Sequence, residues 1–305
     1  MNDMKSSVLP PHVGLGSFAF RYAVGFPGFF PETPMGPDEF LRSAHALGYR
    51  RVQICENLRL PFRSPGELER LNRLSGELGI ALEIGFKKVD EDSLVRYMEI
   101  ARRMGVRFIR AVIHDKDSLT REVRGTIMQQ TSKLLKNWAG RLEDAGVRLG
   151  LENHFDLFTD ELVTIVGEVG SPAIGLVFDT TNSLGFLEPP EITLNKMSGR
   201  IFSMHLKDYT IRKSEAGYEI VGTVLGEGLL NAEKILSDLV GSDPEASVIL
   251  EMAVRRNPDR QVKAVVEWEK EEIRKSTVVL ASIVGNATRA AACSPQYHDR
   301  RTRYV

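Results

Sequence analysis

The chain has 305 residues, with 40 lysine and arginine residues against 41 aspartate and glutamate residues. This near balance of charge gives no strong net field, so it argues against nucleic acid or an anionic membrane as a partner. The first residues contain no apolar core of signal-peptide length, and no stretch approaches the roughly 18 apolar residues of a membrane-spanning helix. The cysteines, Cys55 and Cys293, indicate no disulfide framework. We therefore expect a cytoplasmic location.

Short apolar runs alternate with helical segments along the chain, and most of these runs follow a glycine that ends a helix. The expected strands cover residues 12–16, 51–55, 80–84, 107–113, 147–152, 174–179, 201–205 and 248–251. The helix starts are also visible: Ser64, Pro65 and Glu67 together form a capping box with proline at the first helical position. Eight strands alternating with helices predict a closed (β/α)8 TIM barrel. The alternative, a doubly wound sheet, requires a third glycine after the first strand, and residues 14–19 lack it.

We expect residues 1–288 to form this single barrel domain and residues 289–305 to form a C-terminal tail. The segment 17–36, between the first strand and its helix, is long and rich in aromatic residues. It is expected to form a lid or a wall of the site, where Arg21 contacts an anionic group, with packing onto the barrel rim as the alternative. The mixed charges of residues 267–272 predict an exposed helix face.

Four side chains that can bind metal ions end four successive predicted strands. They are Glu152, Asp179, His205 and Glu251. In such barrels the carboxyl ends of the strands carry the functional groups. A carboxylate or imidazole there is costly to bury unless it is paired or bound to a cation. The set is rich in oxygen, so it suits one Mn²⁺, Mg²⁺ or Co²⁺ ion, with Zn²⁺ as the alternative.

The sequences around these residues resemble those of the xylose-isomerase-like TIM barrel superfamily, and more narrowly its sugar phosphate isomerase/epimerase branch. The resemblance rests on GLENH at 150–154, FDTTNS at 178–183, MHLKD at 204–208, LGEG at 225–228 and ILEM at 249–252. It implies that Glu152, Asp179, His205 and Glu251 hold one divalent metal. It also implies that Glu152 and Glu251 move the proton on either face of the substrate carbon in an epimerase.

The chain departs from this family at Asn182, where many relatives have a histidine. The related apurinic endonucleases need several zinc ions and additional histidines, so this departure and the balanced charge argue against a DNA-repair nuclease.

Further polar residues near these strand ends are candidates for catalysis or substrate binding. His154 lies two residues beyond Glu152 and is a candidate general base. Lys207 lies two residues beyond His205 and is a candidate for stabilising an enolate oxygen, with an ion pair to Asp208 or another acid as the alternative. The candidate substrate-binding residues are His114, Asn182, Arg255 and Arg21. Gln53 and Glu83 are interpreted as polar groups of the core or the mouth.

These observations predict a metal-dependent isomerase or epimerase that acts on a keto-sugar or sugar acid through a metal-stabilised enediolate. The alternative is a lyase on a 3-oxo sugar derivative: a decarboxylase, a dehydratase or a subunit that cleaves C-glycosides. A barrel that only binds a ligand is the third reading, and the intact set of four ligands argues against it. The expected partner is a small carbohydrate-type substrate. A homo-oligomer is a further expectation.

Overall fold

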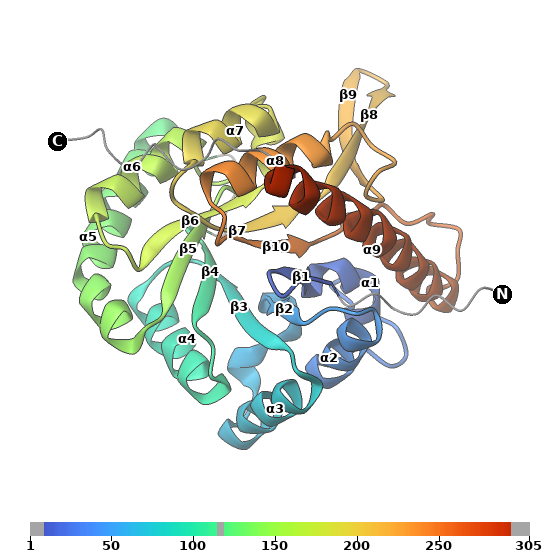
Figure 1. Cartoon of the computed structure of the whole chain (residues 1–305), viewed down its shortest axis with the longest axis horizontal. Coiled ribbons are helices and arrows are strands. Elements are labelled where there is room, and N and C mark those ends of the chain that lie inside the picture. The colour runs from blue at the N-terminus through green and yellow to red at the C-terminus, as the bar shows by residue number, and fades with distance from the viewer. Residues whose placement is uncertain (1–8, 115–118, 294–305) are drawn as a thin grey trace.

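A computed structural model describes residues 9–114 and 119–293, and within them eight parallel strands close a barrel (Figure 1). The order around the barrel is β1-β2-β3-β4-β5-β6-β7-β10. The bounds are β1 Val13–Gly16, β2 Arg51–Ile54, β3 Ala81–Lys87, β4 Phe108–Val112, β5 Arg148–Glu152, β6 Ile174–Asp179, β7 Ile201–Leu206 and β10 Ser247–Leu250. Each predicted strand coincides with one of these eight, so the predicted TIM barrel is confirmed.

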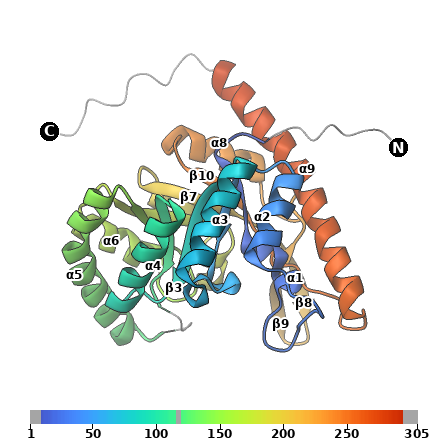
Figure 2. The same ribbon diagram turned by 90° about the horizontal axis from the view of Figure 1, so that it is seen from below.

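Helices surround the barrel, as Figures 1 and 2 show. They are α1 Arg21–Val24, α2 Pro37–Ala46, α3 Pro65–Leu78, α4 Glu91–Met104, α5 Arg121–Ala145, α6 Thr159–Val169, α7 Pro190–Met197, α8 Ala232–Ser242 and α9 Val262–Cys293. Short 3-10 helices cover Ser17–Phe20, Glu56–Leu58, Leu60–Phe62 and Asn182–Phe186. The predicted capping box is present, because Ser64 Oγ accepts from Glu67 N and the Glu67 carboxylate accepts from Ser64 N.

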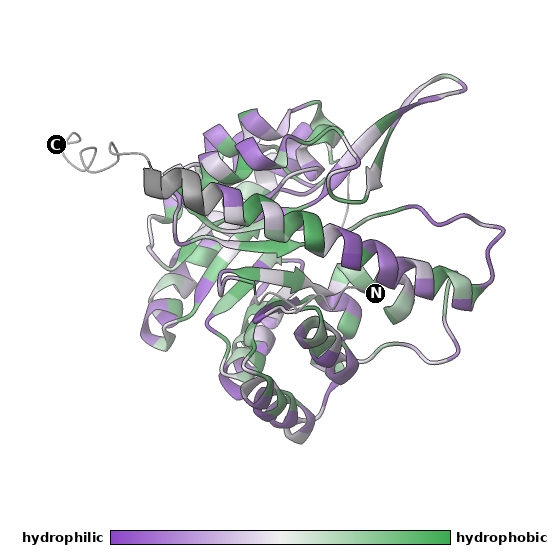
Figure 3. Cartoon of the chain, turned by 45° about the vertical axis from the view of Figure 1, so that its right-hand side comes forward, coloured by the Kyte–Doolittle hydropathy of each residue, from purple (hydrophilic) through white to green (hydrophobic). Residues whose placement is uncertain are grey.

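The core lies inside the barrel and between the strands and the helices. Leu15, Ile54 and Ile84 are fully buried on neighbouring strands. Each buried leucine or isoleucine contributes about 1.5–3 kcal/mol. Figure 3 shows apolar strands and helices whose outer faces are hydrophilic. None of the helices that the structure describes combines the length and apolar composition needed to cross a membrane.

A hairpin that the sequence analysis did not predict stands next to the barrel mouth. Its strands, β8 (Asp208–Ser214) and β9 (Gly217–Thr223), pair antiparallel and project from the body of the molecule (Figure 1). Asp208 anchors the base of the hairpin, because its carboxylate accepts hydrogen bonds from the backbone N–H groups of Gly226, Gly228 and Leu230. A Cβ atom on Gly228 would collide with this carboxylate. This close approach explains the second glycine of the LGEG sequence, Gly228.

The aromatic segment after β1 packs largely against α9. Tyr22 and Phe29 are buried with Val265, and Phe26 and Trp268 pack on the same cluster. For these residues the structure therefore agrees with the alternative expectation, which was packing onto the body of the protein instead of forming a lid. The expected tail begins in the last turn of α9, which runs to Cys293, and residues 294–305 lie outside the described residues.

Glu269 of α9 binds the backbone of this segment. Its two carboxylate oxygens accept hydrogen bonds from the backbone N–H groups of Tyr22, at 2.7 Å, and Ala23, at 2.8 Å. The side chain lies on the buried side of α9, and the residue is only 3% exposed. The expectation that residues 267–272 form an exposed face was therefore wrong at Glu269, whose carboxylate binds buried backbone N–H groups, and at Glu272, which is also buried.

Burial of Glu269 gives a test of this contact. Burial raises the pKa of Glu269 to about 8 from its ordinary value of 4.5, against the opposing effect of the two backbone N–H groups. The folded protein therefore binds a proton more tightly than the unfolded chain does. This carboxyl group favours folding most below pH 4.5, and its contribution falls as the pH rises towards 8.

We expect the free energy of unfolding of the natural protein, relative to that of the Glu269→Gln variant, to decrease between pH 5 and pH 8. Urea unfolding at both pH values measures this difference. Glu267→Gln is an exposed control on the same helix. The difference in free energy of unfolding between the natural protein and this control should not change between pH 5 and pH 8. If the free energy of unfolding changed with pH equally in the natural protein and in Glu269→Gln, the buried contact of Glu269 would not raise its pKa.

Candidate metal centre

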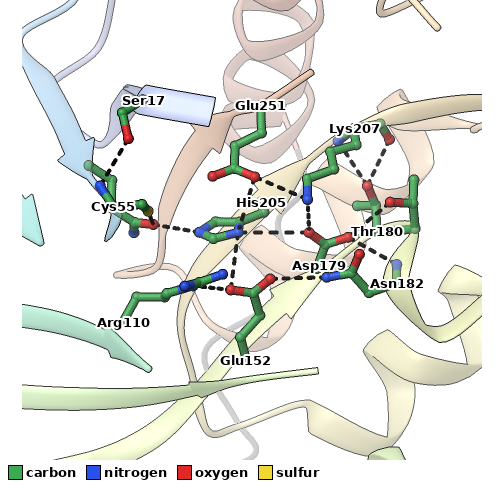
Figure 4. Close-up of polar contacts among 12 residues, drawn as sticks. Ser17, Cys55, Arg110, Glu152, Asp179, Thr180, Asn182, His205, Lys207 and Glu251 are labelled. Carbon is green, nitrogen blue, oxygen red and sulfur yellow. Dashed lines mark hydrogen bonds and ion pairs between the residues drawn. The ribbon is translucent and has the colours of Figure 1, made fainter. Parts of the chain in front are cut away.

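The ends of β5, β6 and β7 bring three of the predicted ligands together. One ligand atom from each of Glu152, Asp179 and His205 lies within 4.8 Å of the other two. All three residues are fully buried, and they point toward one another in Figure 4. The barrel register explains this, because Asp179 and His205 are paired partners on β6 and β7. Residues at the ends of neighbouring parallel strands meet at one edge of the barrel.

Glu251, which follows β10, completes the group from the other side of His205 (Figure 4). The Nδ1 atom of His205 lies 3.5 Å from Glu152 Oε2, 3.8 Å from Asp179 Oδ2 and 3.7 Å from Glu251 Oε2. These separations exceed those of hydrogen bonds. Two ligands bound to one cation at about 2.0–2.3 Å are typically about 3–4 Å apart. The spacing therefore fits three close donors, Glu152, Asp179 and His205, around one ion, and Glu251, next to His205, remains the predicted fourth ligand.

Three buried atoms of this group have no hydrogen-bond partner among the described residues. They are Asp179 Oδ2, which forms an ion pair with Lys207, His205 Nδ1 and Glu251 Oε1. Buried polar atoms are normally hydrogen-bonded, and the binding of an ion is one recognised reason for an exception. The backbone also makes room for the group, because a Cβ atom on Gly16 would lie only 2.7 Å from Glu251 Cγ. The residues present thus fit a divalent cation that prefers oxygen and imidazole ligands.

Two basic side chains compensate the buried carboxylates. Arg110, on β4, forms a buried ion pair with Glu152. Lys207 lies 2.6 Å from Asp179 Oδ2 and 3.0 Å from Glu251 Oε2. The alternative expectation for Lys207, an ion pair with an acid, is thus present, but with Asp179 and Glu251; Asp208 is instead bound to the backbone at the base of the hairpin. Both cations are therefore part of the candidate centre.

These charges shift the pKa values of the ligands. Burial by itself would raise the pKa of Glu152, but Arg110 and His205 outweigh it and hold that pKa well below its usual range. Burial likewise opposes ionisation of Asp179, yet Lys207 brings its pKa to about 2. Burial would lower the pKa of His205, whereas Glu251 and Glu152 raise it to about 10. A metal ion that binds here therefore displaces a proton from the imidazole.

A hydrogen-bond network fixes the ligand carboxylates. Asn182 Nδ2 donates to Glu152 Oε1 at 3.0 Å, and its backbone N–H donates to Asp179 Oδ1 at 3.0 Å. Thr181 N also donates to Asp179 Oδ1, at 2.8 Å. Asn182, predicted to bind substrate, thus holds two of the candidate ligands in place. Because Arg110 takes the other oxygen of Glu152, both oxygens of that carboxylate are engaged.

A cavity of about 870 Å³ opens over this centre. Glu152, His154, Lys207 and Glu251 line it, together with Asn182, Arg21 and Arg255 among the predicted substrate-binding residues. Phe18 and Tyr22 show that the aromatic segment also supplies part of the wall. On its positive side the lining contains Arg21, Lys87, Arg110, Lys207 and Arg255, against Glu152, Asp208 and Glu251. Four of these five basic side chains form ion pairs with acidic residues, and Arg21 is the lining cation for which a contact with a substrate anion remains the expectation.

The other candidates differ in their setting. Burial lowers the pKa of His154 to about 4, so this imidazole is neutral near pH 7. Arg255 is largely exposed and pairs with Glu219 of the hairpin at 3.2 Å. The guanidinium of Arg21 lies over the Phe26 ring, at 4.4 Å from its centroid. His114 follows β4 and is not among the described residues that line the cavity; its backbone N–H donates to Asp156.

Sequence reasoning missed Arg110, although a signal was present. An arginine inside an otherwise apolar strand is costly to bury unless it has an acidic partner. Gly85, on the adjacent strand, leaves space for it, because a Cβ atom there would lie 3.0 Å from Arg110 Cδ. The arginine and the glycine together could have indicated an inward-facing ion pair.

Comparison with known proteins identifies the family. Residues 41–272, more than half of the chain, match the family model described as xylose isomerase-like TIM barrel. The chain belongs to this family. The resemblance seen in the sequence is thus confirmed at the level of the family.

A curated relative, 3-oxo-isoapionate decarboxylase from Pectobacterium atrosepticum, is 29% identical over 241 residues, which cover 78% of this chain and 84% of the relative. A crystal structure of D-psicose 3-epimerase in the presence of D-fructose has a TM-score of 0.67 at 14% identity, covering 90% of this chain and 99% of that one. A xylose isomerase-like TIM barrel protein from Mycobacterium smegmatis in complex with magnesium has a TM-score of 0.61 at 16% identity, covering 88% and 97% of the two chains. At these identities the structural likeness shows the fold alone.

The ligand assignment of this family member can be tested by metal analysis. We expect the purified protein to bind one Mn²⁺ ion per chain, and Asp179→Asn or His205→Ala to weaken that binding by at least about 100-fold, or about 2.7 kcal/mol. Dialysis against Mn²⁺ followed by elemental analysis measures the content. The matched control is Asp160→Asn, since the Asp160 side chain is 73% exposed and pairs only with Lys196 among the described residues. Full metal content in either ligand variant would show that the assignment is wrong.

Proposed function

We propose that this protein is a metal-dependent lyase that removes the carboxylate of a 3-oxo sugar acid. The 29% identity to 3-oxo-isoapionate decarboxylase, over most of both chains, supports this reaction class. The cavity is compatible with this class, because Arg21 lines it and carries a guanidinium that suits a substrate carboxylate.

In this proposal Glu152, Asp179, His205 and Glu251 hold the divalent ion. When bound, such an ion acts as a Lewis acid that polarises a carbonyl oxygen and stabilises negative charge there. The carboxylates themselves are kept ionised and in place by Arg110, Lys207 and Asn182.

The engagement of Glu152 is the observation that carries the choice of reaction. An epimerase that works on two faces needs a glutamate on each face that is free to take and return a proton. Here Arg110 and Asn182 occupy both oxygens of Glu152, and its pKa is held well below the usual range. Glu152 is thus a poor proton carrier. Decarboxylation requires no base, because the bond that breaks releases carbon dioxide and not a proton.

Lys207 is the side chain best placed to assist this step. Its ammonium group lies between Asp179 and Glu251 and lines the cavity. When the bond between the carboxylate carbon and C2 breaks, its electron pair moves toward the C3 oxygen, and Lys207 stabilises the negative charge that develops. C2 then takes up one proton from solvent, which completes the reaction.

An isomerase or epimerase is the second candidate. The observation that favours it is the placement of Glu152 and Glu251 on opposite sides of His205 in Figure 4, with Glu251 Oε1 lacking a hydrogen-bond partner among the described residues. Such an enzyme would exchange a substrate C–H with solvent without releasing carbon dioxide.

The two candidates separate in one assay. We expect 3-oxo sugar acids to release carbon dioxide in the presence of the protein and Mn²⁺. Keto-sugars without a carboxylate are expected to show no solvent deuterium exchange. Exchange or epimerisation of keto-sugars, with no carbon dioxide from any 3-oxo acid, would replace the lyase proposal with the isomerase one.

The role of Lys207 can be tested in the same assay. We expect Lys207→Met to lower turnover by about 100-fold or more, the typical effect of removing one donor to a developing oxyanion. Metal should still bind, because Lys207 is not a ligand and its loss removes a positive charge next to Asp179 and Glu251. Lys234→Met is the matched control, since the Lys234 side chain is 56% exposed on the surface. Near-normal turnover of Lys207→Met with metal bound would remove Lys207 from the mechanism.

A further inference from the structure

A row of buried polar side chains runs from His205 into the interior of the barrel. Gln53 on β2 and Glu83 on β3 are 0% and 1% exposed. They are paired partners in the register of the two strands, so their side chains lie next to each other. An amide and a carboxylate in a barrel core are costly unless each polar atom has a partner. Their contacts therefore require an explanation.

The direction of each hydrogen bond in the row follows from chemistry. Arg51 Nη1 donates to Glu83 Oε1 at 2.7 Å. The ionised carboxylate has acceptors only, so the side chain of Gln53 must present its NH₂ group to Glu83, and this contact measures 3.0 Å. The carbonyl oxygen of Gln53 is thereby turned the other way. It lies 2.7 Å from His205 Nε2.

The orientation of Gln53 determines which nitrogen of His205 keeps its hydrogen when a metal ion displaces one proton and the ring becomes neutral. A carbonyl oxygen can only accept, so Nε2 of His205 must be the donor. The Cys55 thiol is also placed to donate to the same oxygen, at 3.5 Å, which agrees with this orientation. With hydrogen on Nε2, the other nitrogen of the neutral ring offers its lone pair. That nitrogen, Nδ1, is the one that faces Glu152, Asp179 and Glu251.

We propose that Gln53 and Glu83 are positioning residues that hold His205 in the Nε2–H tautomer and so prepare its Nδ1 atom as a metal ligand. The inference rests on the metal site of the proposed function but not on the identity of the reaction. A hydrogen-bond partner on the distal nitrogen of a metal-binding histidine fixes the tautomer and ring orientation, and its loss typically costs about 10- to 100-fold in affinity. Glu83 acts one step further away, through the direction of the Gln53 amide.

The decisive experiment exchanges the amide and the carboxylate. Glu83→Gln alone removes the feature that orients Gln53, since an amide at 83 can face Gln53 with either end. The double variant Gln53→Glu/Glu83→Gln restores a defined direction: the carboxylate at 53 accepts from His205 Nε2, and the amide at 83 donates to that carboxylate and accepts from Arg51. Both variants keep nearly the same side-chain volume.

Zn²⁺ is a suitable probe because it is diamagnetic. Its affinity is measured by competition with a chelator, and the tautomer of His205 by ¹H–¹⁵N correlation spectra of the Zn²⁺-loaded protein. We expect Glu83→Gln to weaken Zn²⁺ binding by about 10- to 100-fold, and the double variant to recover most of that loss together with the Nε2–H signal.

Other results would overturn the inference. One is unchanged Zn²⁺ affinity and an unchanged tautomer in Glu83→Gln. Another is equal weakening in the single and double variants while both remain folded, which would mean that the row only fills the core. If Glu83→Gln does not fold, the double variant alone decides, because it must bind Zn²⁺ nearly as the natural protein does. If the natural protein did not decarboxylate 3-oxo sugar acids but showed the expected Zn²⁺ affinities and His205 tautomer, the proposed reaction would be wrong and the role of Gln53 and Glu83 would stand.

Discussion

Three carboxylates buried side by side repel one another, and the arrangement of the barrel mouth depends on how this repulsion is balanced. Glu152, Asp179 and Glu251 are each almost inaccessible to solvent. An isolated carboxylate cannot be desolvated to this extent without a compensating charge. Arg110, Lys207 and the imidazole of His205 supply that charge within the described residues. A divalent ion at the same place would take over part of it, so the metal and the two basic residues act on one electrostatic balance.

The backbone is adapted to this cluster at places that look structural in the sequence. Gly16 and Gly85 lie in strands, where glycine is unfavourable, yet a side chain at either position would meet Glu251 or Arg110. Asn153 extends the ladder at the strand ends, because its side chain accepts from Asp179 N at 2.6 Å and donates to Asp179 O at 2.9 Å. The closed barrel thus positions the cluster from several strands at once, which limits how far any one ligand can move.

The sequence contained enough information for the barrel and for the four strand-end residues. Hydrophobic runs, helix-ending glycines and the Ser64 capping box involve residues that are close together in the sequence. They can therefore be recognised without knowledge of the fold. The partners of Arg110, Gln53 and Glu83 could not be read in the same way, because each partner lies on another strand. Only the closed barrel shows that Gln53 faces Glu83 on one side and His205 on the other.

Two other features of the structure, the β8–β9 hairpin and the burial of Glu269, were not predicted from the sequence. The strands of the β8–β9 hairpin are mostly exposed or half-buried, so they lack the buried apolar runs by which the barrel strands are predicted. Glu269 sits in a run of mixed charges that is typical of a solvated helix, and only the path of the segment after β1 places two backbone N–H groups on it. For Glu269 the missing information was therefore which distant segment lies alongside the helix.

The electrostatic balance also bears on the class of reaction. A proton carrier must change its charge during turnover, and a residue whose charge is part of a buried balance can do so only at a high energetic cost. Glu152 is tied to Arg110 and Asn182 at its two oxygens, whereas Glu251 keeps one oxygen without a hydrogen bond among the described residues. The two glutamates are therefore not equivalent, although their positions on either side of His205 are nearly symmetric (Figure 4). A reaction that places one mobile proton or none on the protein fits this asymmetry better than one that needs two equivalent bases.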